Sequence, residues 1–319
     1  MDKPRVICTR KWPERVEAAM AEAFDATFNV ADEAMSRDDL KRALDDYDAV
    51  CTTVTDKVDA AVLASPGRAR ILGQFGVGFN NIDVEAAKKA GLAVTNTPGV
   101  LTDATADIAL TLLLNVCRRT FEGETMLRAS EWTGWRPTQL MGLSPQGKTL
   151  GIVGMGRIGK AMAKRCHHAL DMKIVFHDAF PVDDPGVPAE QLATVEEVLA
   201  AADIVSLHCP GGGDNVRLID TDRLAAMKRG AILINTARGD IVDEEALVAA
   251  LEAGHLAGAG LDVFEREPAV TEALKAMPRV CLLPHLGSAT IETREAMGML
   301  VLDNLKAFFA GETPPNRVA

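Results

Sequence analysis

A chain of 319 residues is too long for one compact hydrophobic core and has the length of two domains of ordinary size. Its composition, 48% hydrophobic with 25% charged residues, is typical of a folded globular protein and excludes a largely disordered one. A formal net charge of -11 argues against nucleic acid and anionic membranes as partners, because both surfaces would repel the chain.

Short runs rich in valine and isoleucine alternate with segments of helical period, which is the pattern of a parallel sheet covered by helices on both faces. The first predicted strands are residues 5–9, 26–30, 47–53, 70–75 and 92–97. After the fourth of these, the loop GVGFNNID leads to a helix that Asp83 is placed to cap. The segment NTPGVLTDATADIAL then opens a long helix, capped by Thr102 or Asp103, which marks the passage between two domains.

Residues 119–148 interrupt this alternation and hold two of the three tryptophans among glycines and prolines. So long an irregular insert is usually functional or an interface, although a packed surface loop is the plainer alternative. The most apolar helical stretch, residues 106–117, precedes the insert and favours dimerisation.

A second block of predicted strands follows, and each strand ends in a loop. The strands lie in KTLGIV, KIVFHD, DIVSLHCP, GAILINTARG, GLDVFEREP and RVCLLPHLG. Ligands in open α/β sheets bind beyond the carboxyl ends of the strands, so these loops are the candidates for chemistry. The predicted fold class is α/β, with two Rossmann-like or flavodoxin-like domains on parallel sheets and an active-site cleft between them.

The strongest motif is GMGRIGKAMAKR, in which Gly154, Gly156 and Gly159 follow a strand and open a helix. This is the spacing and the context of a dinucleotide-binding turn. The glycines allow in turn a tight bend, a close approach of backbone to pyrophosphate, and close packing of helix on strand. The helix N-terminus supplies amides and a positive dipole for the phosphates.

Asp178 ends the strand that follows this helix, where a carboxylate can accept the hydroxyls of the adenosine ribose. A capping or turn aspartate is the plainer alternative. A carboxylate at this place would repel a 2'-phosphate, and AFPVDD after it offers no arginine or lysine. NAD(H) is therefore predicted to be preferred over NADP(H).

The six cysteines are scattered singly, with no spacing suited to a disulfide framework or a zinc site. A reducing cytoplasm and no bound metal are the expectation. The N-terminal MDKPRVICTR lacks the apolar core of a signal peptide, and residues 106–117 are too few to span a bilayer. No membrane partner is expected.

Three strand ends hold candidates for the reaction of a nicotinamide cofactor: Arg238 in NTARGD, a glutamate in FEREP, and His285 in LLPHLGS. In FEREP, Glu265 and Glu267 compete for the role. Each candidate has a plain alternative, which is a solvated cap, a charged turn, or a structural histidine held by hydrogen bonds.

The sequence resembles the D-isomer-specific 2-hydroxyacid dehydrogenases along nearly its whole length. The resemblance rests on motifs in the same order, GVGFNNID, NTPGVLTDATAD, GKTLGIVGMGRIG, LINTARGDIVDEEAL, GLDVFEREP and LLPHLGSAT. Within the family it is most similar to the glyoxylate and hydroxypyruvate reductases, notably through EWTGWRP. The resemblance implies a substrate domain of residues 1–98 and 288–319, a Rossmann NAD-binding domain of residues 99–287, and reduction of glyoxylate or hydroxypyruvate to glycolate or D-glycerate.

The resemblance also implies a catalytic triad of Arg238, Glu267 and His285. Hydride attack on a carbonyl carbon builds negative charge on its oxygen, which needs a proton donor, and imidazolium suits neutral pH. Glu267 would favour the protonated ring and orient it, while Arg238 would hold the keto oxygen and the carboxylate. Glu265 and Arg266 are then left as a solvated turn.

Further contacts are implied by resemblance alone. The backbone amides of Val77 and Gly78 would hold the substrate carboxylate, next to Phe79, which departs from the smaller residue common there. Trp135 would reach the substrate pocket from the partner subunit of a homodimer, with a hydrophobic anchor as its alternative. The implied cofactor contacts are Thr105, Arg157, Ile158, Cys209, Pro210, Thr236, Asp262 and Gly287. For Asp262, a strand-end residue bonded to backbone is an equal alternative.

Two other functions stay open. D-3-phosphoglycerate dehydrogenase is the nearest enzyme, but the chain ends at GETPPNRVA without a regulatory extension, and no motif marks a phosphate site. A non-enzymatic NADH-sensing protein of the co-repressor type shares the fold and the triad, and the absence of appended interaction segments disfavours it.

Overall fold

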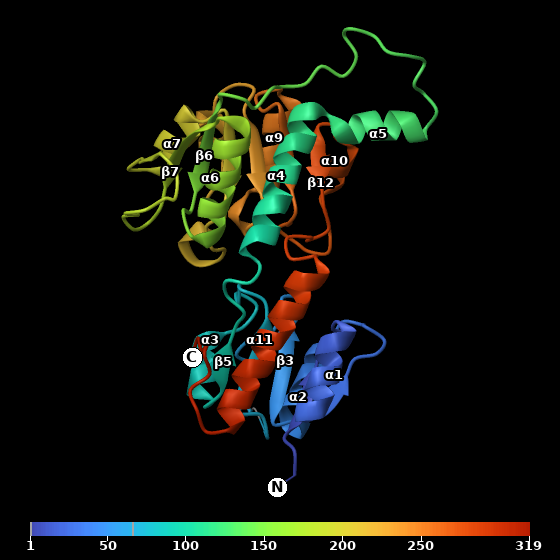
Figure 1. The fold of residues 1–319 in the computed structure, drawn as a ribbon, viewed down its shortest axis with the longest axis vertical. Helices are drawn as coiled ribbons and strands as arrows, with labels where there is room; N and C mark the ends of the chain where they lie inside the picture. Colours follow the sequence, from blue (N-terminus) through green and yellow to red (C-terminus); the bar gives the residue numbers. More distant parts are fainter. Residues whose placement is uncertain (1, 66) are drawn as a thin grey trace. The chain divides into compact units, whose positions relative to one another are not determined.

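The computed structural model describes residues 2–65 and 67–319. The chain divides into two compact units, residues 1–101 with 289–319, and residues 102–288. Each unit is a parallel sheet covered by helices (Figure 1). The predicted α/β class, with two domains built on parallel sheets, is confirmed.

The first unit has, within its described residues, a five-stranded sheet in the order β2-β1-β3-β4-β5. Its elements are β1 (Arg5–Cys8), α1 (Glu14–Ala23), β2 (Asp25–Phe28), α2 (Arg37–Asp46), β3 (Ala49–Thr53), β4 (Ile71–Phe75), α3 (Val84–Lys89), β5 (Ala93–Thr95) and α11 (Ile291–Phe309). Successive strand residues point to opposite faces, so Ile71 packs with α1 and α11 while Leu72 packs with α2 and α3. The C-terminal helix α11 therefore belongs to the core of the first unit.

The second unit has, within the described chain, a seven-stranded sheet in the order β12-β11-β10-β9-β6-β7-β8. Its strands are β6 (Thr149–Val153), β7 (Lys173–His177), β8 (Ala189–Gln191), β9 (Ile204–Leu207), β10 (Ile232–Asn235), β11 (Gly258–Leu261) and β12 (Val280–Leu282). Its helices are α4 (Thr102–Arg118), α5 (Thr120–Arg128), α6 (Arg157–Leu170), α7 (Val195–Ala201), α8 (Thr221–Ala226), α9 (Glu244–Glu252) and α10 (Glu272–Ala276), with 3-10 turns at Gly213–Asn215 and Gly239–Ile241. The chain runs outward from β6 to β8 and returns to β9 on the other side of β6, so the strand order reverses between β6 and β9. Ligands of open α/β sheets bind at such a reversal.

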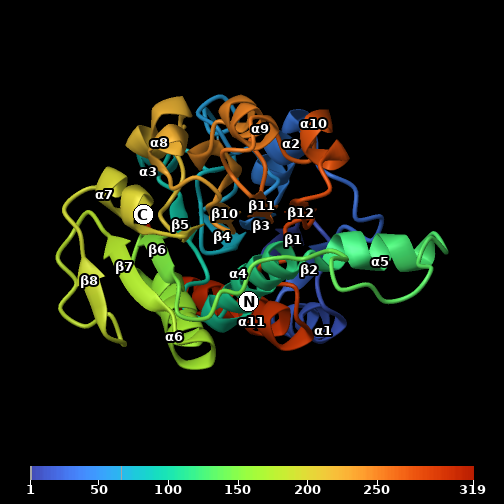
Figure 2. The same ribbon diagram turned by 90° about the horizontal axis from the view of Figure 1, so that it is seen from above.

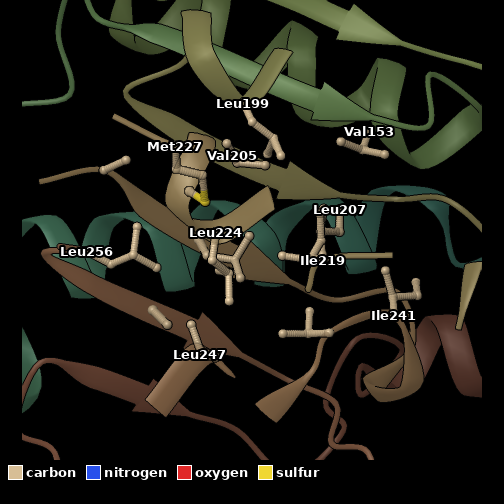
Figure 3. Close-up of a cluster of buried hydrophobic side chains, with 14 of the residues drawn as sticks. Val153, Leu199, Val205, Leu207, Ile219, Leu224, Met227, Ile241, Leu247 and Leu256 are labelled. Atoms are coloured by element: carbon tan, nitrogen blue, oxygen red, sulfur yellow. The ribbon is translucent and has the colours of Figure 1, made fainter. Parts of the chain in front are cut away.

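Apolar side chains cover both faces of this second sheet. Ile204 of β9 packs toward α4 and α6, whereas Val205 and Leu207 point to the opposite face. There they meet Leu224 of α8 and Leu247 of α9, as Figure 3 shows. Burial on both faces explains why these strands read as continuous apolar runs, and it fixes the strand ends that carry the site.

The apolar stretch at residues 106–117 is used inside the second unit. It forms most of α4, which packs against α6, β10 and β11. Leu112 and Leu113 are fully buried there. Much of the apolar surface of α4 is therefore used in the core of the second unit, and the homodimer stays a prediction. Thr102 and Asp103 lie in the first turn of α4.

The irregular segment predicted for residues 119–148 is wrong over Thr120–Arg128, which form α5. Helical spacing supports this helix through the ion pairs of Arg119 with Glu122 and of Arg128 with Glu124. No residue of α5, all of which the structure describes, is buried, so the helix lacks the continuous buried stripe by which a core helix is recognised. Residues 131–148 are irregular, as expected. The exposed edge strand β8 was not expected either.

The structure also describes the cap of α3 and the state of the cysteines. Asp83 caps α3, accepting a hydrogen bond from the amide of Ala86. The six cysteines, which all lie in the described part of the chain, are free thiols. Among the described residues, no helix combines the length and apolarity needed to cross a bilayer. Nor does any group of histidine, cysteine and acidic side chains within residues 2–65 and 67–319 have the arrangement of a metal site.

Candidate active site

The candidate triad stands at the ends of three neighbouring strands. β10, β11 and β12 are parallel and adjacent, so their carboxyl ends meet at one edge of the sheet. Arg238 follows β10, Glu267 follows β11 and His285 follows β12. Residues separated along the chain are brought to one edge by strand order alone.

Glu267 and His285 are directly paired. His285 Nδ1 lies 2.9 Å from Glu267 Oε2, and each side chain is 33% exposed. The other carboxylate oxygen accepts a hydrogen bond of 3.0 Å from the amide of Phe264. Burial raises the pKa of Glu267, but the hydrogen bond and charge of His285, the Phe264 amide and the charge of Arg238 outweigh it and lower that pKa. Glu267 is therefore an ionised partner that leaves Nε2 of the ring available for substrate.

The backbone under His285 is held in a left-handed conformation, with φ of 55°. Its amide donates to the carbonyls of Asp262, at 3.0 Å, and Leu283, at 3.1 Å. The carboxylate of Asp262 then accepts from the amides of Leu286, at 2.6 Å, and Gly287, at 2.8 Å. A non-glycine residue rarely adopts this conformation unless its surroundings enforce it, and such positions cluster at functional sites.

Asp262 is thus a buried strand-end residue bonded to backbone, as the plainer alternative held. Burial raises its pKa, against the lowering effects of the Leu286 and Gly287 amides and of His285. Thr105 supports the same loop, because its hydroxyl donates to the carbonyl of Gly287 at 3.0 Å. These contacts position the loop that carries His285.

Arg238 lies half-buried in a tight turn after β10. Asn235 closes the turn, with Nδ2 donating to the carbonyl of Arg238 at 2.8 Å and Oδ1 accepting from the amide of Ala237 at 3.0 Å. Burial lowers the pKa of Arg238, while the charges of Glu267 and Asp240 raise it. The guanidinium remains charged at neutral pH, and one of its nitrogens, Nη1, donates to the Ala237 carbonyl at 2.6 Å.

Gly239 brings the Arg238 turn against the Glu267 segment. A Cβ added to Gly239 would lie 1.9 Å from the carbonyl carbon of Phe264, so no larger residue fits without moving one of the two loops. Neither this glycine nor its reason was predicted from the sequence. The only indication in the sequence was that a glycine directly follows the candidate arginine.

The glycine turn after β6 has the predicted context, because it leads directly into α6. Gly154 has φ of 94°, and a Cβ there would lie 2.6 Å from the amide nitrogen of Cys209. A Cβ on Gly159 would lie 2.2 Å from the carbonyl oxygen of Gly154, so the helix packs closely on the turn. A Cβ on Gly156 would meet no described atom within 4 Å. The turn thus leaves open space beside the N-terminus of α6, where anionic phosphates bind well.

Asp178 is bonded to this turn. Its Oδ2 accepts from the amide of Met155 at 2.8 Å, and its Oδ1 accepts from the amide of Phe180 at 3.1 Å. A carboxylate oxygen can accept more than one hydrogen bond, so both can still serve a ribose hydroxyl. The structural role and the predicted cofactor role are compatible at this residue.

The switch point between β6 and β9 has further groups suited to a nicotinamide cofactor. Cys209 and Pro210 follow β9, opposite the glycine turn. Burial raises the pKa of Cys209 to about 11, so it is a neutral thiol. After β10, the buried hydroxyl of Thr236 has no hydrogen-bond partner among the described residues. A buried polar atom of this kind fits a site that a polar ligand completes.

His208, at the end of β9, is unsuited to donate a proton at neutral pH. Burial lowers its pKa to about 4, and its Nε2 lies 2.9 Å from the hydroxyl of Ser206. Among the histidines at strand ends, His285 has the carboxylate partner that a proton donor needs.

The solvated turn predicted for Glu265 and Arg266 is wrong for Glu265. Its carboxylate pairs with Arg217 at 3.0 Å, and its amide donates to Oε1 of Glu244 at 2.8 Å. Glu244 is buried at the start of α9 and also accepts a hydrogen bond from the hydroxyl of Thr271. It anchors the segment that carries Glu267. Glu244 was not predicted from the sequence, because local pattern does not show which distant backbone a carboxylate binds.

The predicted substrate contacts Val77 and Gly78 lie in the first unit, directly after β4. The triad belongs to the second unit. Trp135 lies in the irregular segment after α5 and is 79% exposed. Figure 2 shows α5 and this segment extending from the second unit.

Comparison with known proteins places these features in one family. Residues 110–287, which include the glycine turn and all three triad positions, match the family described as "D-isomer specific 2-hydroxyacid dehydrogenase, NAD binding domain". The glyoxylate reductase of Thermococcus litoralis is 45% identical over 322 residues, covering 99% of this chain and 97% of the relative.

Solved structures agree over the full length. The NADPH-dependent glyoxylate/hydroxypyruvate reductase of Sinorhizobium meliloti, in complex with NADP and malonate, is 37% identical with a TM-score of 0.89 and covers 100% of this chain and 97% of that one. The holo D-mandelate dehydrogenase of Rhodotorula graminis is 29% identical with a TM-score of 0.87, covering 100% of this chain and 98% of that one.

Proposed function

The chain belongs to the D-isomer-specific 2-hydroxyacid dehydrogenase family, and on that premise we propose that it reduces glyoxylate or hydroxypyruvate to glycolate or D-glycerate with NADH. The observation that carries the proposal is the pair of Glu267 and His285, with Arg238 at the adjoining strand end. The names of the relatives from Thermococcus litoralis and Sinorhizobium meliloti support this substrate class.

The mechanism assigns one task to each member of the triad. When bound, the nicotinamide supplies the hydride that adds to the carbonyl carbon of the keto acid. His285 donates a proton from Nε2 to the carbonyl oxygen as negative charge develops there, because Nδ1 faces Glu267. Glu267 orients the ring and stabilises its charged form. Arg238 binds the keto oxygen and the carboxylate through its guanidinium donors.

The cofactor contacts proposed here keep the full predicted set. They are Thr105, Gly154, Gly156, Arg157, Ile158, Gly159, Asp178, Cys209, Pro210, Thr236, Asp262 and Gly287. The support is the open space at Gly156, the unpartnered hydroxyl of Thr236 and the amide-bonded carboxylate of Asp178. The first unit is proposed as the substrate domain and the second as the cofactor domain, since the matched NAD-binding region lies inside the second.

Replacing Asp178 with serine is expected to lower the preference for NADH over NADPH, measured as the ratio of kcat/KM values, by about tenfold or more. The carboxylate accepts ribose hydroxyls and repels a 2'-phosphate, and serine removes that charge. Asp183→Ser, which removes a charge from the following loop, is the matched control. An unchanged ratio in Asp178→Ser would show that Asp178 does not set the cofactor preference. The test matters because the relative from Sinorhizobium meliloti is NADPH-dependent.

A homodimer is proposed from the exposed apolar side chains of α5 and the segment after it. Phe121 is 51% exposed and Trp135 79%, with Leu127, Trp132 and Met141 also exposed. Large apolar side chains exposed along one segment suit a contact between subunits, and Trp135 would serve the pocket of the partner subunit. Sedimentation at micromolar concentration is expected to give twice the chain mass of 34.0 kDa. Sedimentation as a monomer at that concentration would contradict both the homodimer and the role of Trp135 in the partner's pocket.

A cytoplasmic location is part of the same proposal, supported by the six free cysteines. The remaining alternatives are a D-3-phosphoglycerate dehydrogenase and a NADH-sensing binding protein. A panel of keto acids and D-2-hydroxy acids with both cofactors separates them, because a sensor binds NADH with little turnover.

A further inference from the structure

The loop after β4 holds three consecutive carbonyl groups in hydrogen bonds. The carbonyl of Gly76 accepts from the amide of Thr97 at 3.0 Å. The carbonyl of Val77 accepts from Nδ2 of Asn96 at 2.9 Å. The carbonyl of Gly78 accepts from Nε2 of Gln74 at 3.2 Å. Each peptide unit of this loop is therefore fixed from one side.

Fixing these carbonyls also fixes the next amides along the chain. A trans peptide is planar, and its carbonyl and N–H point in opposite directions. The bonded carbonyls of Gly76 and Val77 thus turn the N–H groups of Val77 and Gly78 the other way, and the carbonyl of Gly78 does the same for Phe79. Among the described residues, none of these three N–H groups has a hydrogen-bond acceptor. Successive free amides of this kind suit an anion such as a carboxylate.

The two residues that hold the loop are themselves held. Gln74 is fully buried; its Oε1 accepts from the hydroxyl of Thr52 at 2.7 Å, and its Nε2 also donates to Oδ1 of Asn81 at 2.9 Å. Asn96 is fixed through its backbone, with its carbonyl accepting from Nδ2 of Asn304 at 3.3 Å. A donor whose own position is fixed holds its acceptor in one geometry, which is what a preorganised binding site needs.

We propose that Asn96 is a positioning residue for substrate binding: it holds the carbonyl of Val77 and so directs the amide of Gly78 at the carboxylate of the keto acid. Gln74 acts in the same way on the amide of Phe79, which adds a third donor to the two of Val77 and Gly78. This inference rests on the proposed function, since it needs a substrate with a carboxylate.

The test is Asn96→Ala, which removes the side-chain donor without adding charge. KM for glyoxylate is expected to rise about tenfold, the usual effect of one lost hydrogen bond to a charged group, while kcat changes less than about threefold. The inhibition constant of oxamate, an unreactive keto-acid analogue, should rise by the same factor. The dissociation constant of NADH, measured by fluorescence, should be unchanged.

Asn29→Ala is the matched control, because Asn29 also uses its side-chain amide to bind backbone carbonyls of a loop, those of Thr9 at 2.8 Å and Glu33 at 2.7 Å. It should leave KM at the wild-type value. If Asn96→Ala does not fold, Asn96→Ser, whose hydroxyl is too short to reach the Val77 carbonyl, is measured in its place.

The inference is overturned if KM stays within about twofold of wild type, or if Asn29→Ala raises it equally. It is also overturned if kcat and NADH binding fall together with the affinity for glyoxylate, as general damage to the fold would cause. A wild-type protein that reduces no keto acid overturns the proposed function as well, whereas an active wild type with an unaffected Asn96→Ala overturns the role of Asn96 alone.

Discussion

His285→Ala is expected to lose turnover by a factor of about 100 to 10,000 and still bind NADH. His285 is the proton donor in this account, and without it the charge developing on the carbonyl oxygen has no acid to neutralise it. Its loop is anchored by Asp262 through backbone amides, which the substitution leaves in place. Steady-state oxidation of NADH measures turnover, and a fluorescence titration measures binding.

His168→Ala is the control for this variant, because His168 is exposed on α6 and outside the site. It should keep wild-type turnover. Full activity in His285→Ala refutes the assignment of the proton donor. Loss of NADH binding in that variant would instead show that the substitution had disturbed the cofactor domain.

Glu267→Gln is expected to reduce turnover about tenfold or more. The pKa of Glu267 is lowered, with the effects of His285, Phe264 and Arg238 overcoming burial, so the group is a carboxylate at neutral pH. Glutamine keeps an oxygen that can accept from Nδ1 but removes the negative charge. The negative charge that holds the imidazole ring in position for proton donation is then lost.

Glu265→Gln is the matched comparison in the same turn. Glu265 pairs with Arg217, whose side chain is 47% exposed, and solvent screens such a pair, so that it contributes little to stability. Turnover and the pH–rate profile should therefore stay close to wild type. Equal effects of the two substitutions would mean that the carboxylate partner of His285 had been wrongly chosen.

The sequence was sufficient for the features that strand order enforces. Arg238, Glu267 and His285 follow three strands that the alternation predicts as parallel, and parallel neighbours bring their carboxyl ends together. The glycine turn could also be predicted from the sequence. Close backbone packing at Gly154 and Gly159 leaves no room for a side chain, so glycine is required at these positions.

The features that were missed depend on contacts between distant residues. Helix α5 has no buried face, so its sequence lacks the continuous apolar stripe of a core helix. Glu265 was expected in solvent because its partner, Arg217, lies far away along the chain. Glu244 likewise accepts a hydrogen bond from the backbone amide of Glu265, and the spacing of residues within a single helix or strand does not predict such a bond. The local sequence pattern identifies helices and strands. The positions of the loops depend on hydrogen bonds and ion pairs between residues that are distant in sequence and meet only in the folded chain.

The most direct test of the account is the rate of NADH oxidation by the wild-type protein with a panel of keto acids. Glyoxylate, hydroxypyruvate, 3-phosphohydroxypyruvate and phenylglyoxylate are each measured with NADH and with NADPH, and the configuration of chiral products is determined. Turnover of glyoxylate or hydroxypyruvate is expected to exceed that of the other acids, with D-glycerate formed from hydroxypyruvate. Binding of NADH without turnover of any of these acids, or formation of L-glycerate, would contradict it.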